Sequence, residues 1–340
     1  MNLSDFNYNL PENLIAQNPA VERDSSRLMI YDRSTKKIIH THFKNITEYL
    51  SKQDVLVLNN SKVMPARFNF YHNSKLFEIL VLKKISESVF ECMVNPGKKF
   101  KPGSEFKINN NLFCKVENIS ETGRILKFHY NDGTPVSDSD LFCCGSMPLP
   151  PYISNFTGDI NRYQTVYSKI SGSAAAHTAG LHFTESLLDS IKSIVCDVLE
   201  ITLHIGPGTF QPIKNEDFTK HKMHSEHFRI DIDTYSKLKK YKSENKRIIA
   251  VGTTSVRVLE TVFNNKSETS ELSGETDIFI YPGYKFNFID AMITNFHLPK
   301  SSLLMLIAAF AGHNEIMDLY QTAIKHKYKF YSFGDAMLIK

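Results

Sequence analysis

Two glycine-rich stretches, residues 172–184 and 202–210, combine glycines, hydroxyls and histidines at a density that packs poorly as hydrophobic core. The candidate binding residues in them are Thr178, Gly180, His182, His204, Gly206, Gly208 and Thr209. Glycine lets a ligand approach the backbone closely, and histidine exchanges protons near neutral pH. We therefore predict that the two stretches form the floor of an active site for a small polar ligand.

A third stretch, residues 252–255, reads Gly-Thr-Thr-Ser between an expected buried strand and an expected helix. The start of a helix offers unpaired N–H groups and a positive dipole end, which favour a carboxylate or phosphate. Thr253, Thr254 and Ser255 would add hydroxyls, and Arg257 would add a bidentate contact. An ordinary Ser/Thr helix cap explains the same residues equally well.

Two groups among the 13 histidines are candidates for chemistry. His182 and His204 lie among apolar residues and glycines, where burial would keep imidazole neutral and basic. The others, His221, His224 and His227, surround Glu226 without a helical frame or a zinc signature, so we expect no metal. A histidine oriented by Glu226 could carry a proton, while a solvated or structural histidine is the alternative for each one.

Two polar-aromatic segments, residues 163–167 and 294–300, contain Tyr163, Gln164, Asn295 and His297. Aromatic rings stack on nucleic-acid bases, and amides hydrogen-bond to their edges. Buried tyrosines with a solvated hydroxyl would produce similar segments. Base contact is therefore one of two interpretations of these residues.

The run over residues 199–210 resembles at first the strand and glycine loop of a Rossmann fold. Such a loop must open a helix whose amino end meets the ligand. Here Gln211 and Pro212 follow, and no amphipathic pattern begins after them. We therefore predict a non-Rossmann use of the loop.

The parts of the chain that carry these stretches alternate strand and helix patterns. Expected strands span 28–31, 55–58, 199–205, 247–251 and 278–281, and expected helices span 43–50, 183–195, 256–263 and 303–310. Thr184 and the pair Ser301-Ser302 are placed to cap two of the helices, and the polar residues 264–276 are expected to form a loop. The pattern predicts an α/β (α+β-like) main domain with a mixed sheet.

The middle of the chain has a different texture. Short alternating or β-branched runs at 77–85, 89–94, 105–108, 112–119 and 125–130 are separated by turn residues, and no helical period is evident. This predicts a small antiparallel β-barrel inserted into the main domain. The expected domains are 1–64 with 148–340, which form a discontinuous catalytic domain, and the inserted 65–147.

The amino-acid composition and net charge are those of a globular protein: 42% of residues are hydrophobic, 22% are charged, and the formal net charge is +4. Lysine clusters, among them Lys83, Lys84, Lys98, Lys99 and Lys101, permit an RNA partner without demonstrating one. Five cysteines without a Cys-x-x-Cys pair favour reduced thiols over disulfides or zinc. No signal peptide or membrane span is evident, so we expect a cytoplasmic protein.

Ordered motifs along nearly the whole chain resemble the S-adenosylmethionine:tRNA ribosyltransferase-isomerases of queuosine biosynthesis. They include Leu14-Ile-Ala-Gln17, Arg162-Tyr-Gln-Thr-Val-Tyr167, Thr178-Ala-Gly-Leu-His-Phe-Thr184, Leu203-His-Ile-Gly-Pro-Gly-Thr-Phe210, Ala250-Val-Gly-Thr-Thr-Ser-Val-Arg257, Ile293-Thr-Asn-Phe-His-Leu-Pro-Lys300 and Gly334-Asp-Ala-Met337. Departures are few. His177 stands where the family pattern has proline, and Asn60 and Lys62 stand where it more often has Asp and Arg. We give His177 no family role.

The resemblance implies an enzyme that uses S-adenosylmethionine as a ribosyl donor and needs no prosthetic group or metal. Its partner would be a tRNA whose anticodon loop carries 7-aminomethyl-7-deazaguanine at the wobble position. The ribosyl group would be transferred and rearranged to give epoxyqueuosine, with adenine and methionine released. A monomer without membrane attachment is expected.

The resemblance also gives the candidate residues expected roles. His182 or His204, with Glu226, would transfer protons. Thr253, Thr254, Ser255 and Arg257 would hold the methionine carboxylate or a tRNA phosphate. Contacts to a base or to the rest of the substrate would come from Tyr163, Gln164, Thr178, Gly180, Gly206, Gly208, Thr209, Asn295 and His297. The inserted β domain, with its lysines, would hold the anticodon stem.

Two other classes of protein compete with this interpretation. An S-adenosylmethionine-dependent RNA methyltransferase would share the cosubstrate but would leave S-adenosylhomocysteine. A non-catalytic tRNA-binding protein would bind the RNA and release no product. Product analysis separates all three.

Overall fold

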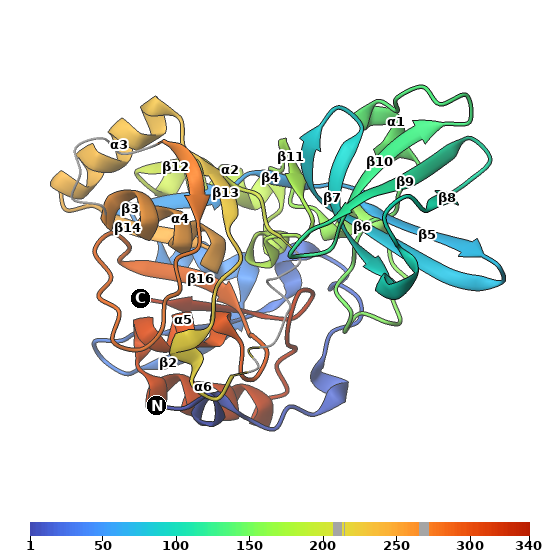
Figure 1. Cartoon of the computed structure of the whole chain (residues 1–340). Coiled ribbons are helices and arrows are strands. Elements are labelled where there is room, and N and C mark those ends of the chain that lie inside the picture. Colours follow the sequence, from blue (N-terminus) through green and yellow to red (C-terminus); the bar gives the residue numbers. More distant parts are fainter. Residues whose placement is uncertain (207–212, 214, 265–271) are drawn as a thin grey trace. The chain divides into compact units, whose positions relative to one another are not determined.

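The computed structural model of the chain describes residues 1–206, 213, 215–264 and 272–340 (Figure 1). Gly208 and Thr209, and most of the loop expected over 264–276, lie outside the described residues. The chain forms two compact units, Met1–Lys62 with Pro150–Ile170 and Ala176–Lys340, and Val63–Leu149 with Ser171–Ala175. The domain division expected from the sequence, 1–64 with 148–340 and the inserted 65–147, stays a prediction.

The first unit is built on a mixed sheet whose described strands run in the order β15-β13-β12-β3-β14-β16-β17-β1-β2. Their bounds are β1 (Arg27–Tyr31), β2 (Ile38–His42), β3 (Asp54–Asn59), β12 (Asp197–Leu203), β13 (Glu226–Arg229), β14 (Arg247–Val251), β15 (Ser273–Thr276), β16 (Ala291–Asn295) and β17 (Ala336–Ile339). The central strands β12, β3, β14 and β16 are parallel, and β17 pairs antiparallel with β16. The carboxyl ends of the central strands therefore meet at one edge of the sheet.

Helices cover both faces of this sheet. They are α2 (Glu185–Ile194), α3 (Ile232–Ser243), α4 (Thr253–Asn264), α5 (Ser302–Ala311) and α6 (His313–Lys325). In β3, Val55 and Val57 pack into the core that holds α3 to α6, while Leu56 and Leu58 pack into the core that holds α2. This alternation follows from the pleat of a strand, and each buried side chain of this size contributes about 1.5–3 kcal/mol. The expected α/β class with a mixed sheet is confirmed.

The expected element boundaries hold best where capping is specific. The Thr184 hydroxyl accepts the Leu187 N–H at 3.1 Å, and the Ser301 hydroxyl accepts the Leu304 N–H at 3.2 Å. The helix expected over 43–50 is instead a 3-10 helix, Phe43–Tyr49, and α4 begins at Thr253, three residues before the expected start. The spacing of apolar residues along the sequence indicates which side chains are buried, but it does not indicate which helical hydrogen-bond pattern the backbone adopts.

The strand expected over 278–281 is wrong. Residues 277–280 carry no strand, and β15 (Ser273–Thr276) lies within the part that was expected to be a loop. Whether a segment forms a strand depends on whether another strand pairs with it, and here it is β15 that pairs antiparallel with β13. The apolar side chains after it pack on the core without joining a ladder.

The second unit holds a six-stranded antiparallel sheet in the order β5-β6-β7-β10-β9-β8. Its strands are β5 (Arg67–His72), β6 (Lys75–Ser86), β7 (Val89–Asn95), β8 (Glu105–Lys107), β9 (Leu112–Ile119) and β10 (Arg124–Tyr130). The expected absence of helix here is wrong, because α1 (Asp138–Cys143) follows the sheet, with the Ser137 hydroxyl accepting the Asp140 N–H. An Asp-rich first turn suits a helix start, which explains α1 without a long apolar period.

The remaining described elements are short. The chain passes between the units in β4 (Ser61–Val63) and β11 (Ile170–Ser173). Single 3-10 turns occur at Leu3–Phe6, Glu12–Leu14, Arg23–Ser25, Gly97–Lys99, Ile160–Tyr163, Thr178–His182 and Phe218–Lys220. Among the described helices none combines the length and apolar character needed to cross a bilayer.

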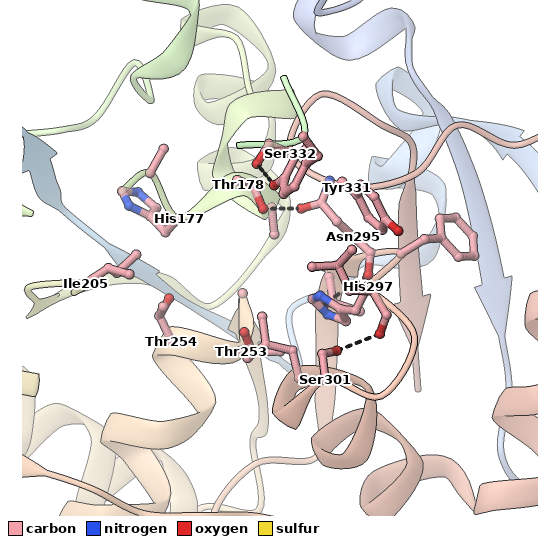
Figure 2. Close-up of a pocket in the computed structure, with 18 residues that line it drawn as sticks. His177, Thr178, Ile205, Thr253, Thr254, Asn295, His297, Ser301, Tyr331 and Ser332 are labelled. Atoms are coloured by element: carbon pink, nitrogen blue, oxygen red, sulfur yellow. Dashed lines mark hydrogen bonds between the residues drawn. The ribbon is translucent and has the colours of Figure 1, made fainter. Parts of the chain in front are cut away.

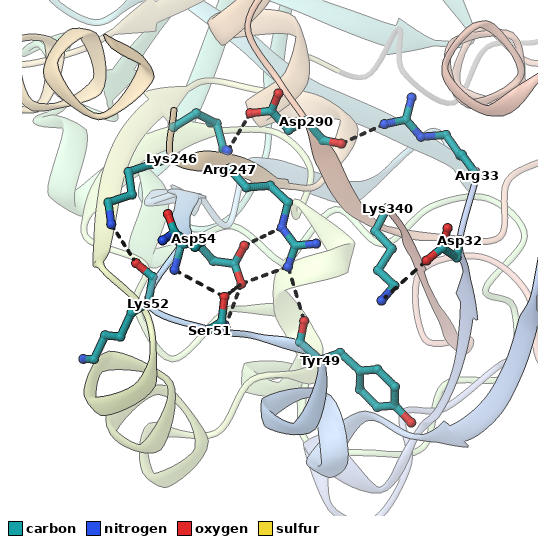
Figure 3. A network of polar contacts seen from close by, with 12 residues as sticks. Asp32, Arg33, Tyr49, Ser51, Lys52, Asp54, Lys246, Arg247, Asp290 and Lys340 are labelled. Carbon is teal, nitrogen blue, oxygen red and sulfur yellow. Dashed lines mark hydrogen bonds and ion pairs between the residues drawn. The ribbon is translucent and has the colours of Figure 1, made fainter. Parts of the chain in front are cut away.

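A polar network ties together the amino ends of the parallel strands (Figure 3). Arg247, at the start of β14, donates to both oxygens of the fully buried Asp54 at the start of β3, at 2.5 and 2.9 Å. The Asp290 carboxylate accepts the Ile248 N–H at 2.8 Å and the Lys242 ammonium at 2.8 and 2.9 Å. These charges fix the register at one end of the sheet and leave the carboxyl ends for other groups.

Candidate active site

A cavity lies in the first unit at the carboxyl ends of β14 and β16 (Figure 2). The space between its walls is about 630 Å³, which includes open solvent. The lining residues are Tyr152, Ala176, His177, Thr178, Ala179, Ile205, Gly252, Thr253, Thr254, Thr294, Asn295, Phe296, His297, Leu298, Ser301, Leu303, Tyr331 and Ser332. Ligands of α/β proteins commonly bind at this edge of the sheet.

The start of α4 forms one side of the cavity. Gly252 turns the chain from β14 into α4 with φ of +84°, a conformation that a side chain would strain, and its N–H bonds the Ile293 carbonyl at 2.8 Å. Thr253 and Thr254 then present the first turn of the helix to the cavity. Because the first N–H groups of a helix lack intrahelical partners, this side of the cavity suits an anion.

A chain of hydrogen bonds runs behind the opposite wall. The Thr178 hydroxyl donates to the side-chain oxygen Oδ1 of Asn295 at 2.8 Å, and Nδ2 of the same side chain lies 3.1 Å from Nε2 of His182 (Figure 2 shows the first bond). The Ser26 hydroxyl contacts Nδ1 of the same ring at 2.7 Å. Thr178 and Asn295 line the cavity and His182 does not, so His182 holds Asn295 in place from the second layer.

Two buried imidazoles of this region are neutral at physiological pH. Burial lowers the pKa of His177 to about 3, and burial with the positive charge of Arg23 does the same for His182. In the unfolded chain histidine titrates near 6.5. A neutral imidazole can donate one hydrogen bond and accept another.

These lowered pKa values predict how stability depends on pH. Between pH 3 and 6.5 the unfolded chain binds more protons than the folded one. The free energy of unfolding is therefore fully developed above pH 6.5 and falls on acidification by up to ~1.4 kcal/mol per pH unit for each histidine. Thermal unfolding between pH 5 and 8 checks this expectation. His177→Asn should make the slope below pH 6.5 shallower, and an unchanged slope would contradict the assignment.

His297 lies on the cavity wall next to the end of β16. Its Nε2 is 2.7 Å from the Thr294 hydroxyl, and its backbone N–H donates to the Tyr320 hydroxyl at 2.8 Å. The Tyr8 hydroxyl donates to the His297 carbonyl. Burial lowers the pKa of His297 to about 3. The ring is thus a fixed, neutral group at the cavity.

Glu226 and Arg257 form a buried ion pair, and neither lines the cavity. Arg257 also donates to the Thr276 carbonyl at 3.2 Å, and the second Glu226 oxygen accepts the Gly206 N–H at 2.8 Å. The pair therefore joins α4, β13, β15 and the segment after β12. Its charges neutralise each other, so the Arg257 guanidinium expected to bind a carboxylate is already bound to one.

His204 precedes Ile205, which lines the cavity. It is half-buried, its ring stacks against that of His227 with centroids 6.1 Å apart, and its Nδ1 has no hydrogen-bond partner among the described residues. Burial, and the charge of His227, lower its pKa. His204 is thus a neutral imidazole next to a lining residue, with one ring nitrogen that has no partner in the described parts of the chain.

The other predicted residues lie outside the lining. Tyr163 is fully buried with its ring edge-on to Phe333, Gln164 follows it, and the Ser255 hydroxyl donates to the Val251 carbonyl. Gly180 belongs to the 3-10 turn Thr178–His182, where a Cβ would come within 2.0 Å of the Tyr167 hydroxyl. Glycine there allows the close packing that places Thr178.

Several lining residues were missed by sequence reasoning. Tyr152 and Ser332 share a hydrogen bond of 2.6 Å, and Tyr331 has φ of +70°. His177 was set aside as a replacement, and Ser301 was assigned only as a cap. Only His177 carried a usable signal, since it belongs to the glycine-rich stretch. Within the described parts of the chain, no three His, Cys, Asp or Glu side chains gather closely enough to hold a metal ion.

Fold and site together define a mixed α/β protein with a polar cavity at the carboxyl ends of its central strands. Comparison with known proteins narrows the class. The family model described as "Queuosine biosynthesis protein" matches residues 3–339. The chain therefore belongs to the family of queuosine biosynthesis proteins.

Relatives match along their whole length. S-adenosylmethionine:tRNA ribosyltransferase-isomerases of Thermosipho africanus and Acetivibrio thermocellus are 50% and 49% identical, each covering 100% of both chains. The crystal structure of S-adenosylmethionine tRNA ribosyltransferase from Thermotoga maritima is 38% identical. It matches with a TM-score of 0.58 over 99% of this chain and 100% of that one.

Proposed function

We propose that this chain transfers and isomerises the ribosyl group of S-adenosylmethionine onto 7-aminomethyl-7-deazaguanine at the wobble position of tRNA. The product is epoxyqueuosine-tRNA, and adenine and methionine are released. The observation that carries the proposal is the sequence identity of 50% and 49%, over the full length of both chains, to two S-adenosylmethionine:tRNA ribosyltransferase-isomerases. That the chain acts in the cytoplasm as a monomer stays a prediction from the sequence.

The experiment that tests this function is incubation with S-adenosylmethionine and tRNA bearing the modified precursor, followed by mass analysis. We expect epoxyqueuosine in the RNA, with adenine and methionine in equal amounts. S-adenosylhomocysteine would identify a methyltransferase instead. Binding of tRNA without any small product would identify a non-catalytic RNA-binding protein.

The cavity is the proposed S-adenosylmethionine site. The amino end of α4, with the Thr253 hydroxyl beside it, would receive the methionine carboxylate. Thr178, Asn295 and His297 would contact the ribose or a base from the other wall. This use of a helix start at a mixed sheet needs no Rossmann glycine loop, and the loop after β12 lies largely outside the described residues.

Protons must move during this reaction. The sulfonium group acidifies the adjacent C5′ hydrogen, so a neutral base must accept that proton, and adenine must gain one as it leaves. We assign the base to His204, because it adjoins the lining residue Ile205, its Nδ1 has no hydrogen-bond partner among the residues that the structure describes, and its lowered pKa keeps it neutral. His182 acts as a positioning residue through Asn295, and Glu226 acts as one through Gly206.

Asn295→Ala should reduce kcat/KM by about 100-fold, since the change frees both Thr178 and His182 and lets the cavity wall shift. Steady-state kinetics checks the value. The matched control is Asn287→Ala, which removes an amide bonded to Asn264 away from the cavity. Equal activity of the two variants would contradict the placement of the site.

The barrel-like sheet of the second unit is the proposed binding platform for tRNA. A hollow on it is lined by His72, Asn73, Lys75, Phe77, Lys99, Ser104, Glu105 and Phe106. Lys75 and Lys99 are exposed, and no ion pair of either occurs among the described residues. Of the lysines expected to contribute, Lys84 already pairs with Asp138 at 2.5 Å.

Lys75→Ala with Lys99→Ala should weaken tRNA binding and lower the slope of log affinity against log salt by about one for each phosphate that is no longer neutralised. Filter binding at salt concentrations from about 50 to about 200 mM checks the predicted change in slope. Lys84→Ala, which removes a paired lysine, is the control and should change less. Identical slopes for the wild type and both variants would contradict the platform.

A further inference from the structure

His177 is a polar side chain of the cavity that the proposed reaction leaves unused. It is 4% exposed, and neither ring nitrogen has a hydrogen-bond partner among the described residues. An unpartnered buried polar group costs about 1–3 kcal/mol, so two free nitrogens on one buried ring call for a missing partner. His177 lines the cavity, so a ligand there can be that partner.

A second group with the same property lies on the same side of the cavity. Thr254 is 9% exposed, and its hydroxyl has no partner within the described parts of the chain. Figure 2 shows His177, Ile205 and Thr254 together on one side, across from His297 and Ser301. Two residues with unpartnered polar atoms, within the described parts of the chain, therefore line the same cavity.

The surroundings of these groups are apolar and uncharged. Ala176, Ala179 and Ile205 line this side of the cavity and are each at most 6% exposed. The ring of His177 is neutral, and Tyr167 packs near it with ring centroids 5.7 Å apart. Such walls suit a flat aromatic ligand, and neutral groups neither attract a carboxylate strongly nor repel a sulfonium.

We propose that His177 and Thr254 bind the hydrogen-bonding edge of the adenine base of S-adenosylmethionine, a role that rests on the proposed function. A neutral imidazole supplies one donor and one acceptor, and a hydroxyl supplies both. The adenine edge matches them, with a 6-amino donor beside ring-nitrogen acceptors. The methionine carboxylate then lies at Thr253, where α4 begins.

The test is calorimetric binding of two ligands without tRNA: S-adenosylmethionine and its analogue with a 6-oxo group in place of the 6-amino group. The wild-type chain should bind the analogue roughly tenfold more weakly. His177→Ala and Thr254→Val should each weaken S-adenosylmethionine binding by about tenfold and reduce the preference between the two ligands. His177→Asn should recover part of the loss, since an amide keeps a donor and an acceptor.

His221→Ala, a histidine outside the cavity, is the matched control and should bind both ligands as the wild type does. Thermal unfolding of every variant separates loss of binding from loss of fold. If His177→Ala unfolds, Thr254→Val still tests the inference, because valine keeps the shape of the threonine side chain. Unchanged affinities and preference in folded His177→Asn and Thr254→Val would overturn the inference and leave buried water as the partner. Failure of the wild-type chain to form epoxyqueuosine from S-adenosylmethionine and the precursor tRNA would instead refute the proposed function.

Discussion

Glu226→Ala should lower the free energy of unfolding by about 3–5 kcal/mol, because it leaves the Arg257 guanidinium buried without its counter-charge. The same change removes the acceptor of the Gly206 N–H. Losses of this size are a large fraction of the stability of an ordinary domain. Chemical denaturation with urea measures the loss directly.

Three further variants separate a structural from a catalytic Glu226. Replacing the pair together, Glu226→Leu with Arg257→Leu, should recover most of the stability, since well-packed apolar residues can substitute for a buried ion pair. Glu244→Ala, an exposed glutamate whose contact to Lys240 is 3.9 Å long, is the control and should change stability little. A Glu226→Gln protein that keeps full stability but loses turnover would contradict the positioning role and restore Glu226 as a catalytic residue.

His204→Ala should reduce the rate of a single turnover by about 100- to 10,000-fold, the usual contribution of a positioned general base. Binding of S-adenosylmethionine should change far less, because a general base acts on the proton that moves in the transition state and contributes little to binding of the ground state. Rapid-quench measurement of adenine release gives the rate, and calorimetry gives the affinity.

The pH dependence of turnover adds an independent check on His204. Burial and His227 lower its pKa, so the base should remain neutral and active above pH 6.5 and lose activity only as pH falls through the lowered pKa. His227→Ala, which removes the stacked neighbour but not the base, should retain turnover. Full single-turnover activity in His204→Ala would refute the assignment.

The fold was predictable where local chemistry is specific. Unbroken apolar runs such as residues 55–58 identify strands covered on both faces, and hydroxyls such as Thr184 identify helix starts. The short strands β13 and β15 were not predictable, because each is stabilised by pairing with a segment distant in the chain. The same reason explains the wrong strand over 278–281.

The stretches that form the site were predictable from the sequence, but which of their side chains reach the cavity was not. The stretches containing Thr178, Thr253 and Asn295 do meet at one cavity. Sequence spacing could not show that Arg257 is bound by Glu226, or that Asn295 stands between His182 and the cavity. These arrangements depend on which of several polar side chains faces inward, and that is decided by packing across the sheet.

The central claim is that the cavity between the start of α4 and the end of β16 holds S-adenosylmethionine. A crystal structure of the chain soaked with S-adenosylmethionine tests it most directly. We expect the adenine edge within hydrogen-bond distance of His177 and Thr254, and the methionine carboxylate at the amino end of α4. An ordered ligand bound elsewhere in the first unit, with this cavity filled only by water, would contradict the account.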